Sequence, residues 1–99
     1  MAKVIWTDSA LLELDLIAQY IALDKPDAAK KLVKTILNTT KQLELFPKSG
    51  RIPTEINHLN YLEIIVKPCR IFYRIDGDKV YIVYIMRDKQ DLKKYLLNS

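Results

Sequence analysis

The residues with the most distinctive chemistry in this chain are its four arginines, all in its second half: Arg51, Arg70, Arg74 and Arg87. A guanidinium group stays charged at physiological pH, and its planar fork of N–H donors matches the oxygens of a carboxylate or a phosphate. Arg70, Phe72 and Arg74 share one strand face, because successive side chains of a strand point to opposite sides. We expect the four guanidinium groups to converge on one sheet face and its flanking loop, where they bind phosphates or an acidic protein segment.

Glu63 gives Arg70 a second interpretation. Both residues belong to segments with the composition of strands, and a buried charge needs a partner of opposite sign. An internal ion pair between Arg70 and Glu63 is therefore an alternative to an external partner. The two roles are compatible, since Glu63 can also orient Arg70.

The C-terminal segment adds three lysines and a tyrosine to the candidate partner-binding set: Lys89, Lys93, Lys94 and Tyr95. A basic patch of this kind fits contact with nucleic acid or an acidic protein, and a solvated helix face gives the same pattern. Both interpretations stay open at this point.

Other reactive side chains are assigned to ordinary roles. His58 is interpreted as a surface residue of a loop, and Cys69 as a packing residue, because no aspartate or asparagine is placed to orient a base beside it. Tyr73, Tyr81 and Tyr84 are interpreted as core or cross-strand residues. Acidic residues and histidine never occur at metal-ligand spacing, and no glycine-rich phosphate loop follows a strand. We predict no metal and no cofactor.

Composition restricts the class of protein. The 99 residues, 49% hydrophobic and 28% charged, fit a single globular domain over residues 1–99. The single cysteine excludes an intramolecular disulfide, which favours a reducing, cytoplasmic location. The sequence shows no targeting or membrane-spanning run. The net charge of +4 favours acidic partners.

Hydrophobic periodicity predicts a strand and two helices in the first half. Residues 2–6 are β-prone, and the oxygens of the following Thr-Asp-Ser segment can cap a helix that runs to about residue 22. A second amphipathic helix begins at Pro26 and is stopped by Pro47. The short link makes the two helices an antiparallel hairpin.

The second half is predicted to be irregular over 47–60 and then to form three strands, over 61–66, 69–75 and 79–86. The Asp-Gly pair at residues 76 and 77 suits a tight hairpin turn. A short helix is expected over 88–99. The fold class is therefore α+β: a helical hairpin on one face of a mainly antiparallel four-stranded sheet, with the opposite face open to a partner.

In combination, these segments resemble the RelE/ParE toxin superfamily of type II toxin–antitoxin systems. The pattern W-T-x-x-A-x-x-x-L-x-x-I-A-x-Y-I-A, then P-x-A-A at the start of a long helix, then L-F-P-x-S-G-R is similar to the ParE branch. Glu63 followed by C-R-I-F-Y-R-I and V-Y-I-V-Y-I-M-R-D completes the similarity. The resemblance covers nearly the whole chain and implies the same helix-on-sheet architecture.

The resemblance also implies partners. A short cognate antitoxin neutralises such toxins, and oligomers are expected to form through it. ParE-type toxins act on DNA gyrase, whereas RelE-type toxins cut messenger RNA in the ribosome. The gyrase inhibitor is the first choice for this chain, and the ribosome-dependent endonuclease is the alternative. A non-toxic relative that retains only antitoxin binding is the third hypothesis.

The two branches can be compared residue by residue. An endonuclease of this kind would use Arg51, Arg70, Arg87 and Tyr95, because RNA cutting without a metal needs cations for the phosphate and groups that move protons. Where the ribonucleases carry two lysines this chain has Leu62 and Ile64, and Arg87 stands where many relatives have histidine. The incomplete set favours a toxin that binds its target and is not an enzyme.

Overall fold

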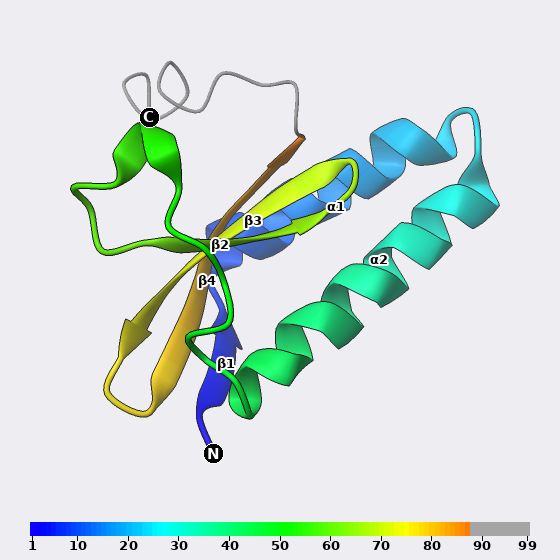
Figure 1. Ribbon diagram of the computed structural model, residues 1–99. Helices are drawn as coiled ribbons and strands as arrows, with labels where there is room; N and C mark the ends of the chain where they lie inside the picture. Colours follow the sequence, from blue (N-terminus) through cyan, green and yellow to red (C-terminus); the bar gives the residue numbers. More distant parts are fainter. Residues whose placement is uncertain (88–99) are drawn as a thin grey trace.

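The computed structural model describes residues 1–87, so the helix predicted over 88–99 lies outside the described residues. The described elements, in chain order, are β1 (Lys3–Trp6), α1 (Asp8–Ala22), α2 (Pro26–Lys41), the 3-10 turns η1 (Gln42–Glu44) and η2 (Thr54–Ile56), β2 (Leu62–Val66), β3 (Cys69–Asp76) and β4 (Lys79–Arg87). Figure 1 shows the helical hairpin beside the sheet. The α+β prediction is confirmed.

Local signals set the helix boundaries. The Thr7 hydroxyl accepts a hydrogen bond from the Ala10 N–H at 3.2 Å and caps α1, and Pro26 occupies the first turn of α2. The prediction that Pro47 stops the second helix is wrong by one and a half turns. After Lys41 the chain tightens into η1, which buries Leu43 and brings the Glu44 carbonyl to the Ala2 N–H at 2.9 Å.

The four strands lie in the order β1-β4-β3-β2. β2, β3 and β4 form an antiparallel meander, while β1 pairs with β4 in parallel, so the sheet is mainly antiparallel as expected. The predicted turn between β3 and β4 is confirmed, because Gly77 has a φ of 62°, which glycine adopts without steric cost.

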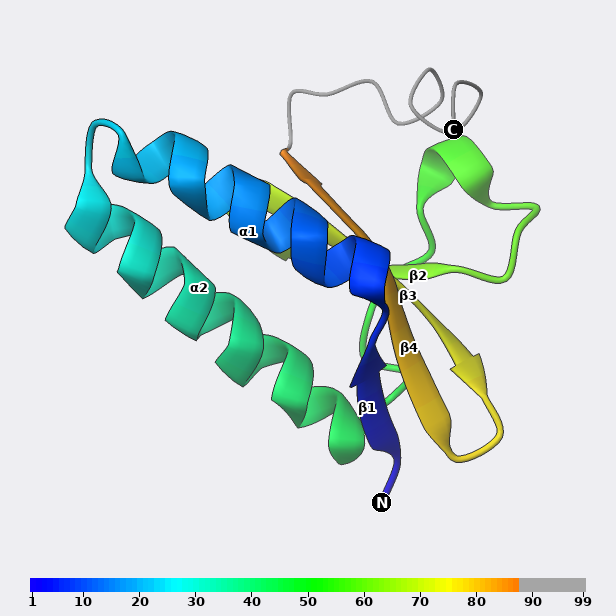
Figure 2. The same cartoon turned by 180° about the vertical axis from the view of Figure 1, so that it is seen from behind.

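Both helices cover the same face of the sheet, with α1 drawn in front of the strands in Figure 2. The main core lies between the helices and the sheet. The strands contribute these residues to it: Ile71, Tyr73, Val80, Ile82 and Ile85. Trp6 packs against this core, although it remains partly exposed. None of the helices in the described part of the chain could cross a bilayer.

The opposite sheet face is not fully open, which corrects the expectation from sequence. Ile56 of η2 packs with Phe72 of β3 and Met86 of β4 to form a second, smaller core. Phe72 and Met86 are large apolar side chains on the face away from the helices, so their exposure to water would be energetically unfavourable. The segment from 53 to 61 crosses this face and supplies the cover, while the part near Arg74 and Tyr81 stays accessible.

A buried tyrosine fixes the loop that follows η1. The Tyr73 hydroxyl donates to the Pro47 carbonyl at 2.8 Å and accepts from the Gly50 N–H at 2.9 Å. Burial also raises the pKa of Tyr73, which keeps the hydroxyl protonated for the first bond. A Cβ on Gly50 would lie 2.5 Å from the Tyr73 hydroxyl and 2.8 Å from the Glu63 carbonyl. Tyr73 therefore anchors the start of the loop to the main core.

We predict that Gly50→Ala lowers the free energy of unfolding by about 2 kcal/mol, because the added methyl group cannot be accommodated without moving buried atoms. Urea unfolding followed by circular dichroism measures this change. Gly77→Asn is the matched control, since nothing lies within 4 Å of a Cβ at Gly77 and asparagine tolerates its positive φ. Equal losses in the two variants would contradict the tight approach at Gly50.

Candidate functional site

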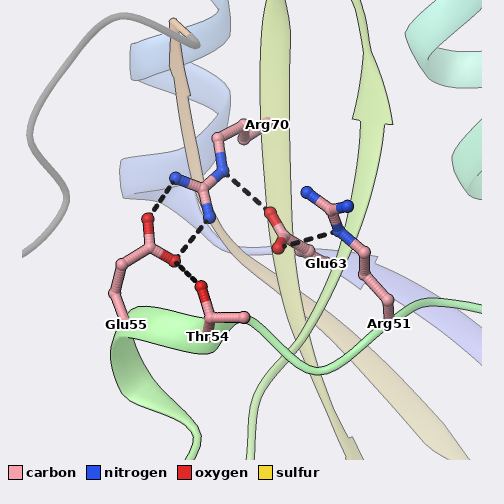
Figure 3. Close-up of polar contacts among 5 residues, drawn as sticks. All are labelled: Arg51, Thr54, Glu55, Glu63 and Arg70. Atoms are coloured by element: carbon pink, nitrogen blue, oxygen red, sulfur yellow. Dashed lines mark hydrogen bonds and ion pairs between the residues drawn. The ribbon is translucent and has the colours of Figure 1, made fainter.

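The centre of the candidate site is Arg70, which two carboxylates bind from different sides (Figure 3). Its Nε–H donates to Glu63 Oε1 at 2.8 Å. Its two terminal nitrogens donate to the two oxygens of Glu55, at 2.7 and 3.0 Å. The guanidinium carbon also lies 5.1 Å from the centroid of the Phe72 ring. The Arg70 fork is thus occupied by the chain's own acidic groups.

Arg51 completes the site from the other side of Glu63. Its Nε–H donates to Glu63 Oε2 at 3.1 Å. Its backbone pairs with the backbone of Glu63 in both directions, at 3.0 and 2.8 Å, so residue 51 extends the sheet beyond β2. Glu63 therefore joins two guanidinium groups, of which Arg70 is buried and Arg51 has 65% of its side chain exposed.

Two positive and two negative side chains balance each other in this cluster. The bidentate hydrogen bonds from Arg70 are the main cause that lowers the pKa of Glu55 from 4.5 to about 2, although burial opposes the shift. The same bonds, together with the hydrogen bond that Arg70 donates to Glu63, raise the pKa of Arg70 further above its ordinary range. A buried charge is tolerated only when it is paired, and here the pairing is complete.

A cleft of about 280 Å³ lies over this cluster. Its lining residues are Arg51, Ile52, Thr54, Glu55, Glu63 and Arg70. Thr54 also contacts Glu55, with 3.4 Å between the hydroxyl and Oε1. The walls are polar, and the floor is the Arg70–Glu63 pair. With Glu55 in place the charges that line the cleft balance, so the cleft offers guanidinium donors and carboxylate acceptors but has no net charge.

The four arginines do not all converge, which corrects the expectation from sequence. Arg74 shares a face with Arg70, but it lies over the Tyr81 ring at 4.6 Å and has Asp76 at 3.9 Å. Arg87 lies across the sheet from both. It pairs in register with buried Cys69 and places its guanidinium 4.6 Å from the ring of Tyr20 on α1.

The remaining candidates divide into confirmed positions and untested ones. Cys69 and Tyr73 are buried in the main core, as predicted, and His58 is an exposed loop residue. Lys89, Lys93, Lys94 and Tyr95 lie outside the described residues. Among residues 1–87, no group of three or more potential ligands could hold a metal ion.

Glu55 is the site residue that the sequence analysis missed. It lies in a 3-10 turn of an irregular segment, where neither the helical nor the strand period predicts a direction for the side chain. The only available signal was charge: an acidic residue in a loop next to a strand pair that already contained a buried arginine. That signal is too general to identify a contact.

The lowered pKa of Glu55 predicts a pH-dependent contribution to stability. A carboxylate with a lowered pKa in the folded state stabilises the protein above its ordinary pKa, and this contribution is lost as the pH falls through the folded value. The difference in free energy of unfolding between the wild type and Glu55→Gln should be constant above about pH 5 and shrink toward about pH 2. Urea unfolding at a series of pH values measures it, and a difference that does not change with pH would contradict the ion pair.

Comparison with known proteins places this architecture in a family. Residues 4–92 match the family model described as the ParE toxin of the type II toxin–antitoxin system parDE. The chain is 37% identical over 94 residues to the protein named "Putative toxin Y4kP" of Sinorhizobium fredii, covering 95% of this chain and 96% of that protein. It is 34% identical over 85 residues to Toxin RelE2 of Caulobacter vibrioides, covering 86% of this chain and 93% of that protein.

Solved structures agree in fold. A chain of the chromosomal ParDE toxin–antitoxin system from P. aeruginosa superposes with a TM-score of 0.75 at 24% identity, covering 88% of this chain and 96% of that chain. A chain of the RelB-RelE antitoxin–toxin complex from Methanococcus jannaschii has a TM-score of 0.54 at 15% identity, covering 95% of each chain. The family match and the two relatives in sequence show that the chain belongs to the ParE toxins of type II toxin–antitoxin systems, within the RelE/ParE superfamily.

Proposed function

We propose that this ParE-family toxin inhibits DNA gyrase by binding it directly, without chemistry of its own, and that a cognate antitoxin neutralises it. The observation that carries the proposal is the state of Arg70. Its guanidinium makes three hydrogen bonds to Glu55 and Glu63, so the cation that an endonuclease would need for phosphate is already neutralised. An arginine held in this way supports a binding surface better than a reaction centre.

The messenger-RNA endonuclease remains the second candidate, because one relative is named Toxin RelE2. Three features weigh against it. Leu62 and Ile64 pack against the main core under the helices, so they do not reach the cleft. Glu63, the β2 residue that does reach it, is acidic and would repel a phosphate. Arg87 lies on the other face of the sheet from Arg70, so the proposed catalytic set is divided.

The antitoxin has a suitable docking surface on the helical hairpin. An apolar groove of about 560 Å³ runs between α1 and α2, lined by residues that include Ala22, Ala29 and Val33, with Lys30 and Lys34 also in its lining. Exposed apolar surface of this kind marks contact sites for partners. An amphipathic antitoxin helix with acidic flanks would complement it, and both structural neighbours come from toxin–antitoxin systems.

A supercoiling assay tests the proposed activity. Purified toxin should inhibit gyrase supercoiling of relaxed plasmid, and the product of the adjacent reading frame should restore it. Unchanged supercoiling at saturating toxin, together with cleavage of messenger RNA at ribosomal A sites mapped by primer extension, would favour the endonuclease instead. Absence of growth arrest when the toxin is induced alone would favour the non-toxic relative.

We further predict that the basic C-terminal segment contributes to gyrase binding. Lys93→Ala combined with Lys94→Ala should weaken inhibition, and the difference in inhibition from wild type should narrow at high salt, because salt screens the attraction between charges of opposite sign. The matched control is Lys30→Ala with Lys34→Ala, which removes the same charge from the helical groove. Equal weakening in both double variants would show a general effect of net charge.

A further inference from the structure

We propose that Arg70 and Arg51 form a binding site for one carboxylate of an acidic protein segment, and that Glu55 occupies this site as an internal substitute for that ligand. This deepens the proposed function and rests on it, because it describes how the toxin recognises a protein partner.

The two carboxylates that bind Arg70 are held in very different ways. Glu63 belongs to β2, has 2% of its side chain exposed and is bound by both arginines, so it is part of the framework. Glu55 belongs to a short 3-10 turn, has 36% of its side chain exposed and faces the cleft. Glu55 can therefore leave without opening a strand, whereas Glu63 cannot.

The geometry of Glu55 is that of a bound ligand. Its two oxygens accept from the two terminal nitrogens of Arg70 at 2.7 and 3.0 Å, which is the bidentate arrangement that guanidinium groups form with carboxylates. The carboxylate of an incoming aspartate or glutamate can take the same two hydrogen bonds. The exchange replaces one such pair with another, and Glu55 regains its hydration in solvent.

Charge sets the number of groups that the site can accept. With Glu55 in place, Arg51 and Arg70 are balanced by Glu55 and Glu63. When Glu55 leaves, one net positive charge remains beside a carboxylate that cannot move. This charge matches one carboxylate and disfavours a dense polyanion, whose neighbouring phosphates would approach Glu63.

The rim of the cleft favours a protein over a nucleic acid. Ile52 lies in the cleft lining with 61% exposure, and Ile65, which is 36% exposed, shares the Glu63 face of β2 and pairs in register with Arg70. Exposed isoleucines gain from contact with apolar side chains, which a peptide offers and a sugar-phosphate backbone does not. The fitting ligand is an acidic side chain flanked by apolar residues.

The test measures binding of two probes to the full chain: a peptide with blocked ends in which a single glutamate is flanked by leucines, and an oligouridylate of equal charge. Glu55→Gln should tighten binding of the peptide about tenfold, because the site loses its internal competitor. Asp76→Asn is the control: it removes the same charge from an exposed position beside Arg74. It should change binding of the peptide by less than about twofold.

Other outcomes overturn the proposal. Equal tightening by Glu55→Gln and Asp76→Asn would show a general charge effect, and no tightening would show that Glu55 does not compete. If Glu55→Gln tightens binding of the oligouridylate more than binding of the peptide, the site would be assigned to nucleic acid. In Glu55→Gln, the peptide should also move the Arg70 Nε–H resonance, and an unmoved resonance would place the binding elsewhere. Gyrase is absent from this experiment. A negative result would therefore reject this binding site, and the supercoiling assay would still test the proposed function independently.

Discussion

The buried pair of Arg70 and Glu63 is the constraint on which much of the sheet's outer face depends. The two residues are diagonal neighbours on adjacent strands, since Arg70 pairs in register with Ile65 and Glu63 with Phe72. A charge at this depth is stable only if each hydrogen-bonding position finds a partner. The free donors of Arg70 therefore draw in Glu55, and the free oxygen of Glu63 draws in Arg51. An irregular segment is thereby fixed on the sheet at two points.

The smaller core depends on the attachment of this segment to the sheet. With the segment held at residues 51 and 55, Ile56 lies over Phe72 and Met86 and closes the second core. Tyr73 holds the preceding stretch from the other face through its hydroxyl group. The contacts of Arg51 with Glu63 and the burial of Ile56 therefore hold the loop on the sheet, even when the Glu55 carboxylate is exchanged for another. The site and the smaller core form one unit.

The sequence was sufficient to predict the elements that have a strong period. The helices, the three later strands and the Asp-Gly turn follow from residue spacing and from the conformational freedom of Gly77, which local rules describe well. The face of the sheet on which Arg87 lies could not be predicted from residue spacing. A register shift lies between Phe72 and Tyr73, where the β4 partners change from Tyr84 to Ile82, and this irregularity reverses the alternation of faces along β4.

The site was predictable only in part, for a similar reason. The Arg70–Glu63 contact was one of two interpretations of the strand pattern, and the structure confirms it. Glu55 was not accessible to such reasoning, because its place depends on tertiary contacts of a loop and not on its own neighbours.

The parallel pairing of β1 with β4 has a consequence for the order in which the sheet assembles during folding. Lys3 pairs in register with Lys79, so β1 can join the sheet only after β4 is in place. Contacts between such distant segments form late, because closing a long loop costs entropy. The β2–β3–β4 meander can therefore form before β1 reaches it, and until then β4 is an edge strand whose unpaired backbone N–H and C=O groups can pair with another chain.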